Sequence, residues 1–457
     1  MIKVITYGSY DLLHYGHIRL LERAKALGDY LIVGVTSDDY DKTRGKINLQ
    51  QSLMERVEAV RATGLADEII IEEYEGQKID DIRKYNIDIF TVGSDWEGYF
   101  DYLNDYCKVI YLPRTEGVSS SELRSDKNHI RIGLVGEFKS RLTSIPKFMR
   151  EVKYVNGAEP VSIFGDEEYQ GLKPVPDYKE FLNSVDAVYI ASLPSLHYRQ
   201  VKMALAYGKH VLCESPIALS PGEYEELTNL AKENHCILLD GIKTAYATAY
   251  ERMLLLIKSG KIGKVISVNS VCTSLKDFSN NNTKDFEQNW NTITEWGPPA
   301  LLPIFQILGV DYKDFWITAL PVEGNKDFDG YSKIDFLFDS ATATVQIGKQ
   351  VKAEGNLIIS GTEGYIYVPA PWWKTDYFEV RYEDTDDNKR YFYQLDGEGI
   401  RYEIVAFVRA ILSGKPDIYI EQPVSKAICT VMEKFYSHNV YYLNNQWEES
   451  IDESINS

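Results

Sequence analysis

Two short apolar runs, each ending in a glycine turn that leads into a helical pattern, constrain this chain more than any other feature. They are KVITYG at residues 3–8 and IRIGLVG at residues 130–136. After each run, further short strands alternate with amphipathic helical segments, which is the pattern of a parallel, doubly wound sheet. With 457 residues the chain is also too long for one ordinary core. We therefore predict two Rossmann-like α/β units in tandem.

The pattern changes from about residue 264, where longer strands with alternating apolar and polar residues begin, as in SATATVQIG at 340–348. This is typical of an α+β domain with a large, mainly antiparallel sheet, and two helical segments follow it. We predict four segments: a first α/β domain at 1–127, a second Rossmann-like domain at 128–263, the sheet domain with its closing helices at 264–445, and an acidic tail at 446–457.

Composition limits the classes of partner. The formal net charge of −19 argues against a nucleic-acid or anionic-membrane surface, so an anionic ligand needs a locally built site. Five scattered cysteines without a C-x-x-C pair suit a reducing compartment. The first residues enter a strand directly, and no apolar run is long enough to cross a bilayer. We expect a cytoplasmic protein without a leader peptide or membrane insertion.

The stretch YGSYDLLHYGH at residues 7–17 places His14 and His17 around a glycine, where the first strand gives way to a helix. A metal site would need further His, Cys or carboxylate ligands, and none is patterned nearby, so no protein ligand to a metal is assigned. Two histidines at a helix start could also be satisfied polar residues. The third reading is an anion site, because Gly16 lets a phosphate approach the backbone and the first N–H groups of a helix attract anions.

A second stretch, RTEGVSSSEL at residues 114–123, favours the anion site. Ser119 stands three residues before Glu122, the spacing of a capping box, so a second helix is expected to begin there. Arg114 and three hydroxyls lie next to this helix start. Two phosphate-binding helix starts on one sheet suit a triphosphate.

These two stretches, with GSDWEG at residues 93–98 between them, resemble the signatures of the glycerol-3-phosphate cytidylyltransferase family over residues 1 to about 125. H-x-G-H alone marks the wider nucleotidyltransferase superfamily, whereas the combination is specific. Departures are mild: Ser9 and Tyr10 replace the usual Thr and Phe, and Ser120 and Ser121 replace threonines.

The resemblance implies roles for individual residues. Those implied to be catalytic are His14, His17, Lys46 and Arg114; those implied to bind the nucleotide are Ser9, Tyr10, Gly16, Arg56, Asp95, Thr115, Ser119 and Ser120; Asp11 is implied to contact the acceptor. Taken alone, Lys46 and Arg56 would be ordinary surface residues. The implied substrates are CTP, with Mg²⁺, and a polyol phosphate.

The chemistry of such a site needs no protein nucleophile. The phosphate of the acceptor attacks the α-phosphorus of CTP in line, and pyrophosphate leaves. Catalysis then consists of positioning and of neutralising the charge that develops, which imidazole, lysine, arginine and helix N-termini supply. The expected product is a CDP-polyol, CDP-glycerol by default, for a teichoic acid, capsule or other cell-surface polymer.

Residues 130 to about 445 resemble the Gfo/Idh/MocA oxidoreductases, through IRIGLVG, HYRQVKMALAYGKHVLCESP and LIKSGKIGKV. Such proteins are typically NAD(P)-dependent and commonly dimerise through the sheet face, so a homodimer is expected. Three key positions depart from the family. After Gly136 the fingerprint holds Phe138 and Arg141 in place of glycines, Ser215 replaces the catalytic lysine, and the late motif EWGPP puts Glu295 and Pro299 where Asp and His are usual.

A proline cannot act as a proton donor, so NAD(P)-linked reduction by this half is doubtful. Lys243 or Tyr246 could replace the missing acid, although for Lys243 a structural lysine is the commoner case. Three hypotheses remain. The second half could be a scaffold, dimeriser or ligand-binding module attached to a cytidylyltransferase; it could reduce a keto-phosphate to supply the polyol phosphate; or the whole chain could be a binding protein that responds to CTP or CDP. The sequence does not identify the polyol phosphate.

Overall fold

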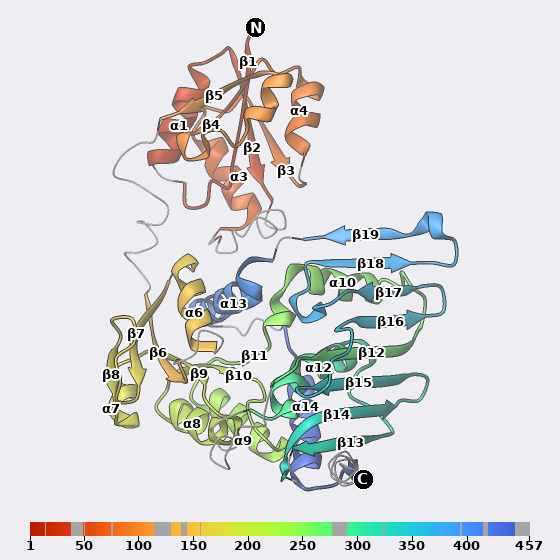
Figure 1. Ribbon diagram of the computed structural model, residues 1–457. Coiled ribbons are helices and arrows are strands. Elements are labelled where there is room, and N and C mark those ends of the chain that lie inside the picture. The colour runs from red at the N-terminus through yellow and green to blue at the C-terminus, as the bar shows by residue number, and fades with distance from the viewer. Residues whose placement is uncertain are drawn as a thin grey trace, which may run out of the picture. The chain divides into compact units, whose positions relative to one another are not determined.

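The computed structural model describes residues 1–13, 15–37, 49, 51–74, 76–113, 129–138, 144–155, 157–276, 290–322, 325–393, 395–414 and 419–443, without the side chains of residues 95 and 396. The chain forms two compact units, residues 1–129 and 130–457, which are described separately (Figure 1). The finer boundary at residue 263 and the start of the tail at 446 stay predictions. Within the described ranges, none of the helices combines the length and apolar character that crossing a membrane requires.

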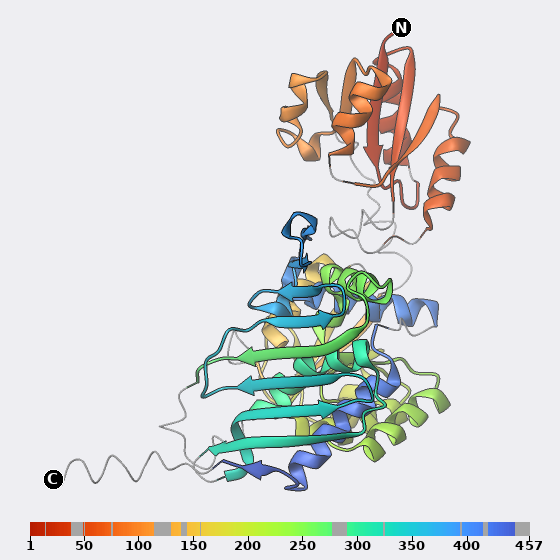
Figure 2. The same cartoon turned by 90° about the vertical axis from the view of Figure 1, so that its right-hand side faces the viewer.

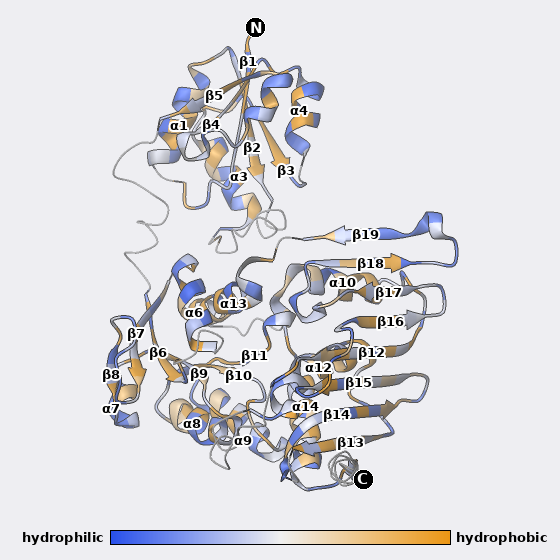
Figure 3. Ribbon diagram, in the orientation of Figure 1, coloured by the Kyte–Doolittle hydropathy of each residue, from blue (hydrophilic) through white to orange (hydrophobic). Residues whose placement is uncertain are grey.

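The first unit is a five-stranded parallel sheet with strand order β3-β2-β1-β4-β5. Alternate residues of a strand point to opposite faces, so Val4 packs with helices α1 and α3 while the neighbouring Ile5 packs with α4. Figure 3 shows the resulting apolar strands between more polar helices. The elements are β1 Lys3–Gly8, α1 Tyr15–Lys25, β2 Tyr30–Thr36, α3 Leu53–Ala62, β3 Glu68–Glu72, α4 Gln77–Tyr85, β4 Ile89–Gly93, η1 Ser94–Trp96, η2 Asp101–Asp105 and β5 Lys108–Leu112.

The second unit begins with a six-stranded parallel sheet, order β11-β10-β9-β6-β7-β8. Helix α6 packs against β6 and against the later helix α13, whereas α8 packs on β9, β10 and α9. The elements are β6 Ile130–Gly136, α6 Ser144–Glu151, η3 Val152–Tyr154, β7 Ala158–Phe164, β8 Lys173–Val175, α7 Tyr178–Asn183, β9 Ala187–Ala191, α8 Pro194–Ala206, β10 His210–Glu214, α9 Pro221–Glu233 and β11 Leu238–Gly241.

A nine-stranded sheet, order β19-β18-β17-β16-β12-β15-β14-β13-β20, completes the second unit. Helix α12 packs on β12, β14 and β15, and Figure 2 looks onto the opposite face of the sheet. Its elements are η4 Lys243–Tyr246, α10 Thr248–Lys258, β12 Val265–Thr273, α12 Thr292–Leu308, β13 Asp314–Val322, β14 Asn325–Leu337, β15 Thr342–Gly348, β16 Leu357–Gly361, β17 Tyr365–Val368, η5 Trp372–Lys374, β18 Tyr377–Arg381, η6 Thr385–Asp387, β19 Lys389–Phe392, η7 Asp396–Gly399, α13 Ile400–Ser413, α14 Gln422–Tyr436 and β20 Tyr441–Tyr442.

The predicted fold class is confirmed: two Rossmann-like parallel sheets, followed by a large and mainly antiparallel sheet. That sheet is mixed, because β12 pairs in parallel with β15, and β13 pairs in parallel with β20. The parallel pair β12–β15 joins strands that are far apart in sequence, which periodicity within each strand does not reveal.

Candidate active site

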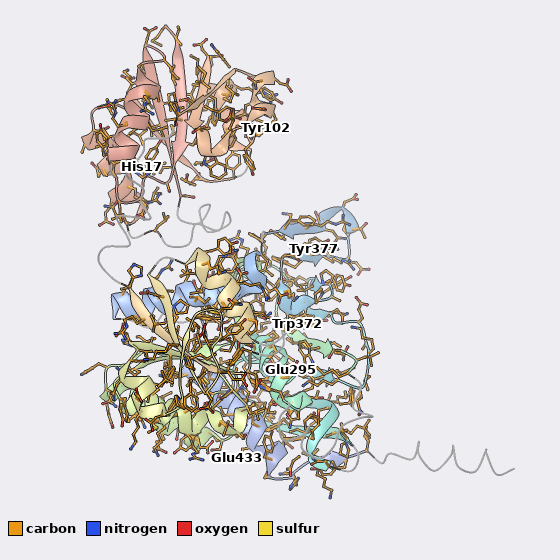
Figure 4. The ribbon with its side chains drawn as sticks, turned by 60° about the vertical axis from the view of Figure 1, so that its left-hand side comes forward. His17, Tyr102, Glu295, Trp372, Tyr377 and Glu433 are labelled. Carbon is orange, nitrogen blue, oxygen red and sulfur yellow. The ribbon has the colours of Figure 1, made fainter. Side chains whose placement is uncertain are left out.

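Residues 9–13, which lead from β1 into α1 and are called the histidine turn below, lie at the carboxyl end of β1, the edge where open α/β sheets bind ligands. Helix α1 begins at Tyr15, so Gly16 and His17 belong to its first turn, where backbone N–H groups lack partners within the helix. The His17 ring (labelled in Figure 4) meets the Tyr10 ring edge to face, with 5.5 Å between the ring centroids. The predicted position of His17 at a helix start is thus confirmed, and its chemical role stays a prediction.

The side chain of Tyr10 packs inside the histidine turn. Its side chain is 1% exposed, and it fills the space beside Gly8, where a Cβ would lie 3.0 Å from the Tyr10 ring. Tyr10 and Leu12 both have left-handed φ angles, 51° and 47°, which fold the chain back tightly before the helix. The nucleotide contact implied for Tyr10 stays a prediction, and in the structure its ring packs beside Gly8 and against the His17 ring.

Arg56 is buried, with 0% of its surface exposed, and its guanidinium holds backbone carbonyls from three segments. It donates to the oxygens of Ser9 at 2.6 Å, Thr36 at 2.8 Å and Gln51 at 3.2 Å. The fork of a guanidinium suits such multiple donation better than any other side chain. In this geometry Arg56 ties the histidine turn to the end of β2 and to the start of α3.

Asp11 is also buried, and it accepts from the N–H of Gln51 at 3.0 Å, while the Gln51 side chain accepts from the N–H of Leu12 at 2.8 Å. This reciprocal pair fixes the turn to α3, whose N-terminus carries a capping box between Ser52 and Glu55. An acceptor contact by Asp11 stays a prediction.

Several predicted residues cannot be placed. Asp95 lies in η1, but its side chain falls outside the described part. Outside the described residues altogether lie His14, Lys46, Arg114, Thr115, Ser119 and Ser120. Among the described residues, no three His, Cys, Asp or Glu side chains are grouped in a way that could hold a metal ion.

The structure also contains a buried network of charged and polar side chains in the first unit that the sequence analysis did not predict. At the carboxyl ends of β2 and β3, Glu72 accepts from the Thr36 hydroxyl at 3.1 Å and pairs with Lys78, whose ammonium lies 4.6 Å from the centre of the Tyr7 ring. Tyr7 in turn donates to Asp81 at 2.9 Å, and burial raises the pKa of Tyr7. The signal was available, since Glu72 continues the inward alternation of the strand EIIIE with a charge.

In the second unit, the position of Gly136, the first glycine of the fingerprint, leaves no room for a side chain. A Cβ on Gly136 would lie 2.5 Å from the carbonyl oxygen of Ala191. Two residues later, Phe138 packs against Tyr169 with 4.8 Å between ring centroids. The alignment of Phe138 with the second glycine of the fingerprint, where a pyrophosphate would approach the backbone, stays a prediction.

Ser215, which replaces the family's lysine, is 6% exposed at the end of β10. The preceding Glu214 is partly buried and accepts a hydrogen bond from Tyr189. Burial raises the pKa of Glu214, and burial also raises the pKa of nearby Asp240 to about 6. The carboxyl groups of Glu214 and Asp240 thus lie at this edge of the parallel sheet, and Ser215 stands where the resemblance to the Gfo/Idh/MocA oxidoreductases implies a lysine.

Glu295 and Pro299 lie on α12 as predicted, with Glu295 in its first turn. The Glu295 carboxylate (labelled in Figure 4) pairs with the buried Lys349 and, at 3.5 Å, with Lys276. Lys349 also donates to the carbonyl of Trp290 at 2.5 Å, and its burial lowers the pKa of its ammonium. Lys349 was not singled out from sequence, although it continues the inward alternation of SATATVQIG.

Lys243 follows β11 and donates to Glu398 at 3.0 Å. It is therefore engaged in an ion pair with a residue near the start of α13. Its suggested role as a replacement acid stays a prediction.

The first unit matches known cytidylyltransferases. The family model described as cytidylyltransferase-like matches residues 5–126. The glycerol-3-phosphate cytidylyltransferase of Bacillus spizizenii is 50% identical over 126 residues, which are 28% of this chain and 97% of that protein. The Staphylococcus aureus protein of the same name is 47% identical over 130 residues, 28% of this chain and 95% of that protein.

The second unit matches oxidoreductases more distantly. The model of the Gfo/Idh/MocA oxidoreductase family with an NAD-binding Rossmann fold matches residues 155–241. The scyllo-inositol 2-dehydrogenase (NADP⁺) IolU of Bacillus subtilis is 25% identical over 273 residues, 56% of this chain and 80% of that protein. The 3-ketoreductase KijD10 of Actinomadura kijaniata shares the fold, with a TM-score of 0.59, 19% identity and coverage of 69% of this chain and all of that one.

These matches and the two sheets together assign the chain. It belongs to the glycerol-3-phosphate cytidylyltransferase family through its first unit, a nucleotidyltransferase domain that is fused to a Gfo/Idh/MocA oxidoreductase-type domain.

Proposed function

We propose that the first unit transfers the cytidylyl group of CTP to a small polyol phosphate, with glycerol phosphate as the first candidate, and releases pyrophosphate. The observation that carries the proposal is the position of His17 in the first turn of α1, at the edge of the sheet where open α/β folds bind ligands. The unit that holds this residue is 50% identical in sequence to a glycerol-3-phosphate cytidylyltransferase. We further propose that the product serves cell-surface polymer synthesis from the cytoplasm.

In this mechanism the first unit binds and positions rather than attacks. His17 would donate to phosphoryl oxygens of the triphosphate, and the positive end of the α1 helix dipole would face the same charge. His14, Lys46, Arg114, Ser119 and Ser120 are proposed to complete the site. Mg²⁺ bound to the triphosphate would neutralise part of its charge. The acceptor phosphate needs no general base because it is already ionised.

The acceptor is tested by a pyrophosphate-release screen of the full chain with CTP against a panel of polyol phosphates. Glycerol 3-phosphate, glycerol 2-phosphate and longer polyol phosphates form the panel, and ATP replaces CTP in a parallel series. We expect CTP-dependent release with one small polyol phosphate. A strong preference for ATP, or no release with any member, contradicts the proposal.

We propose that the second unit is a scaffold, dimeriser or ligand-binding module. The sheet face opposite α12 (Figure 2) is the proposed dimer surface. Trp316 and Leu337, which alternate with the buried residues of β13 and β14, are 40% and 42% exposed. The second candidate, reduction of a keto-phosphate with NAD(P)H, is favoured by the match to the NAD-binding family model. It is disfavoured by Ser215 and Pro299, which remove the two usual proton donors.

Titration of the full chain with NADH and NADPH by calorimetry separates the two candidates. We expect no binding at micromolar concentrations, because Phe138, which packs on Tyr169, is predicted to stand at the second glycine of the fingerprint, where the backbone must approach the pyrophosphate. The variant Phe138→Gly serves as the matched comparison and is expected to bind more tightly than the natural chain. Micromolar affinity of the natural chain, with oxidation that depends on dihydroxyacetone phosphate or a longer keto-phosphate, would establish the bifunctional enzyme instead.

A further inference from the structure

Three lysine ammonium groups from separate parts of the second unit converge on one carboxylate, that of Glu398. The Nζ atoms of Lys374, Lys243 and Lys147 lie 2.6, 3.0 and 3.8 Å from its oxygens. Lys147 comes from α6, Lys243 follows β11, and Lys374 ends η5, which connects β17 with β18 of the large sheet. The cluster therefore lies beside the carboxyl edge of the parallel sheet, where open α/β folds bind ligands.

The cluster carries more positive than negative charge. Two further carboxyl groups, Glu214 and Glu403, interact electrostatically with Lys243, but burial raises the pKa of both and favours their neutral forms. Burial and the repulsion by Lys243 lower the pKa of the Lys147 ammonium. The three ammonium groups share the Glu398 carboxylate within 3.8 Å. Burial alone would raise the pKa of Glu398, but the lysines outweigh burial and lower that pKa to about 2.

The turn that carries Glu398 is built in an unusual backbone conformation. Gly397, Glu398 and Gly399 all have left-handed φ angles of 58°, 58° and 92°, which is costly for the non-glycine residue. A Cβ on Gly397 would lie 2.1 Å from a carboxylate oxygen of Glu151, which Arg401 holds at 3.0 Å. The sequence Gly-Glu-Gly thereby inserts one carboxylate among the lysines at a cost in backbone strain.

The four side chains remain accessible. Their exposed fractions range from 24% for Lys243 to 39% for Glu398. A ligand can therefore reach the ammonium groups without unfolding the unit, provided that the Glu398 carboxylate gives way.

We propose that Lys147, Lys243 and Lys374 bind the phosphate of a small phosphate monoester, and that Glu398 is an internal carboxylate which this phosphate displaces. A phosphate monoester is close to a dianion at neutral pH, since its second ionisation lies near about pH 6, and three ammonium donors match its oxygens. The choice of ester rests on the proposed function, because the first unit is proposed to consume such a compound. The anion site itself rests on the geometry of the lysines.

Calorimetric titration of the full chain, without CTP, tests the site with glycerol 3-phosphate, dihydroxyacetone phosphate and inorganic phosphate as separate probes. Lys374→Met is expected to weaken binding of an ester at least about tenfold, the loss for one charged donor. Glu398→Gln is expected to strengthen the same binding by at least about threefold, because the competing carboxylate loses its charge. Lys147→Met should act in the direction of Lys374→Met. The control is Lys313→Met, which removes an exposed lysine paired with Asp339 on the sheet domain and should change nothing.

The test depends on opposite changes in affinity for the ester: weaker binding by the lysine variants and stronger binding by the glutamate variant. If both weaken binding, or if no ester binding responds to either, the cluster is structural and the proposal is wrong. If inorganic phosphate binds as tightly as every ester, the assignment to a phosphate monoester is wrong. Thermal unfolding of each variant checks that the second unit is folded. Pyrophosphate release by the same variants reports on the first unit alone, so that failure of the proposed transfer reaction is recognised separately.

Discussion

His17→Ala is expected to lower the turnover of pyrophosphate release, with CTP and glycerol 3-phosphate, by at least about a hundredfold, which is the scale of losing one preorganised donor to a developing charge. The structure supports this size of effect because the imidazole is held by α1 and by the edge-to-face contact with Tyr10 rather than free to rotate in solvent. Such a donor costs no reorganisation when the charge develops. The same loss is expected for His14→Ala.

Steady-state kinetics of the full chain measures this prediction, and Glu22→Gln on the exposed side of the same helix is the control. The control should keep turnover within about twofold, as surface changes away from a site do. Thermal unfolding should show that His17→Ala is folded. Near-normal turnover in both histidine variants would show that neither histidine contributes to catalysis.

Arg56→Met should destabilise the first unit by about 3–5 kcal/mol, because one buried and two partly buried carbonyl groups lose a charged donor and methionine offers none. The carbonyls belong to Ser9, Thr36 and Gln51, so the histidine turn should lose its fixed geometry together with stability. In a unit of this size such a loss lowers the unfolding temperature by roughly 10 °C or more.

Scanning calorimetry of the full chain measures the effect, and the transition that CTP shifts upward is assigned to the first unit. Arg61→Met is the matched control, since Arg61 lies on the same helix but is 60% exposed and pairs with Glu58 on the surface. We expect it to shift the transition by no more than about 2 °C. Equal shifts for the two variants would mean that Arg56 does not hold the turn.

The fold could be predicted from sequence largely because its signals are local. Strands such as KVITYG and IRIGLVG are short apolar runs bounded by glycine turns, and the structure places β1 and β6 on them. The pairing of β12 with β15 in parallel was not predictable, since it depends on which strands meet across the sheet rather than on their own pattern.

In the candidate site, too, features set by neighbouring residues could be predicted, whereas contacts between distant segments could not. Gly16 and His17 could be placed at a helix start because the motif and the start of the helix adjoin in sequence. Arg56 was assigned to phosphate from resemblance, whereas the structure shows its guanidinium on backbone carbonyls, which a residue's own neighbours in sequence do not reveal. Lys349 was missed because its partner Glu295 lies 54 residues away in the chain. Glu398 was missed because its lysine partners lie at least 24 residues away and it sits in a left-handed turn.

Identification of the product tests the central claim most directly. The full chain is incubated with CTP, Mg²⁺ and glycerol 3-phosphate, and phosphorus NMR with mass spectrometry follows the nucleotide. The account predicts stoichiometric formation of CDP-glycerol and pyrophosphate, which His17→Ala abolishes on the same time scale. Release of inorganic phosphate with CDP, or recovery of unchanged CTP with glycerol 3-phosphate and with every other polyol phosphate of the panel, would contradict it.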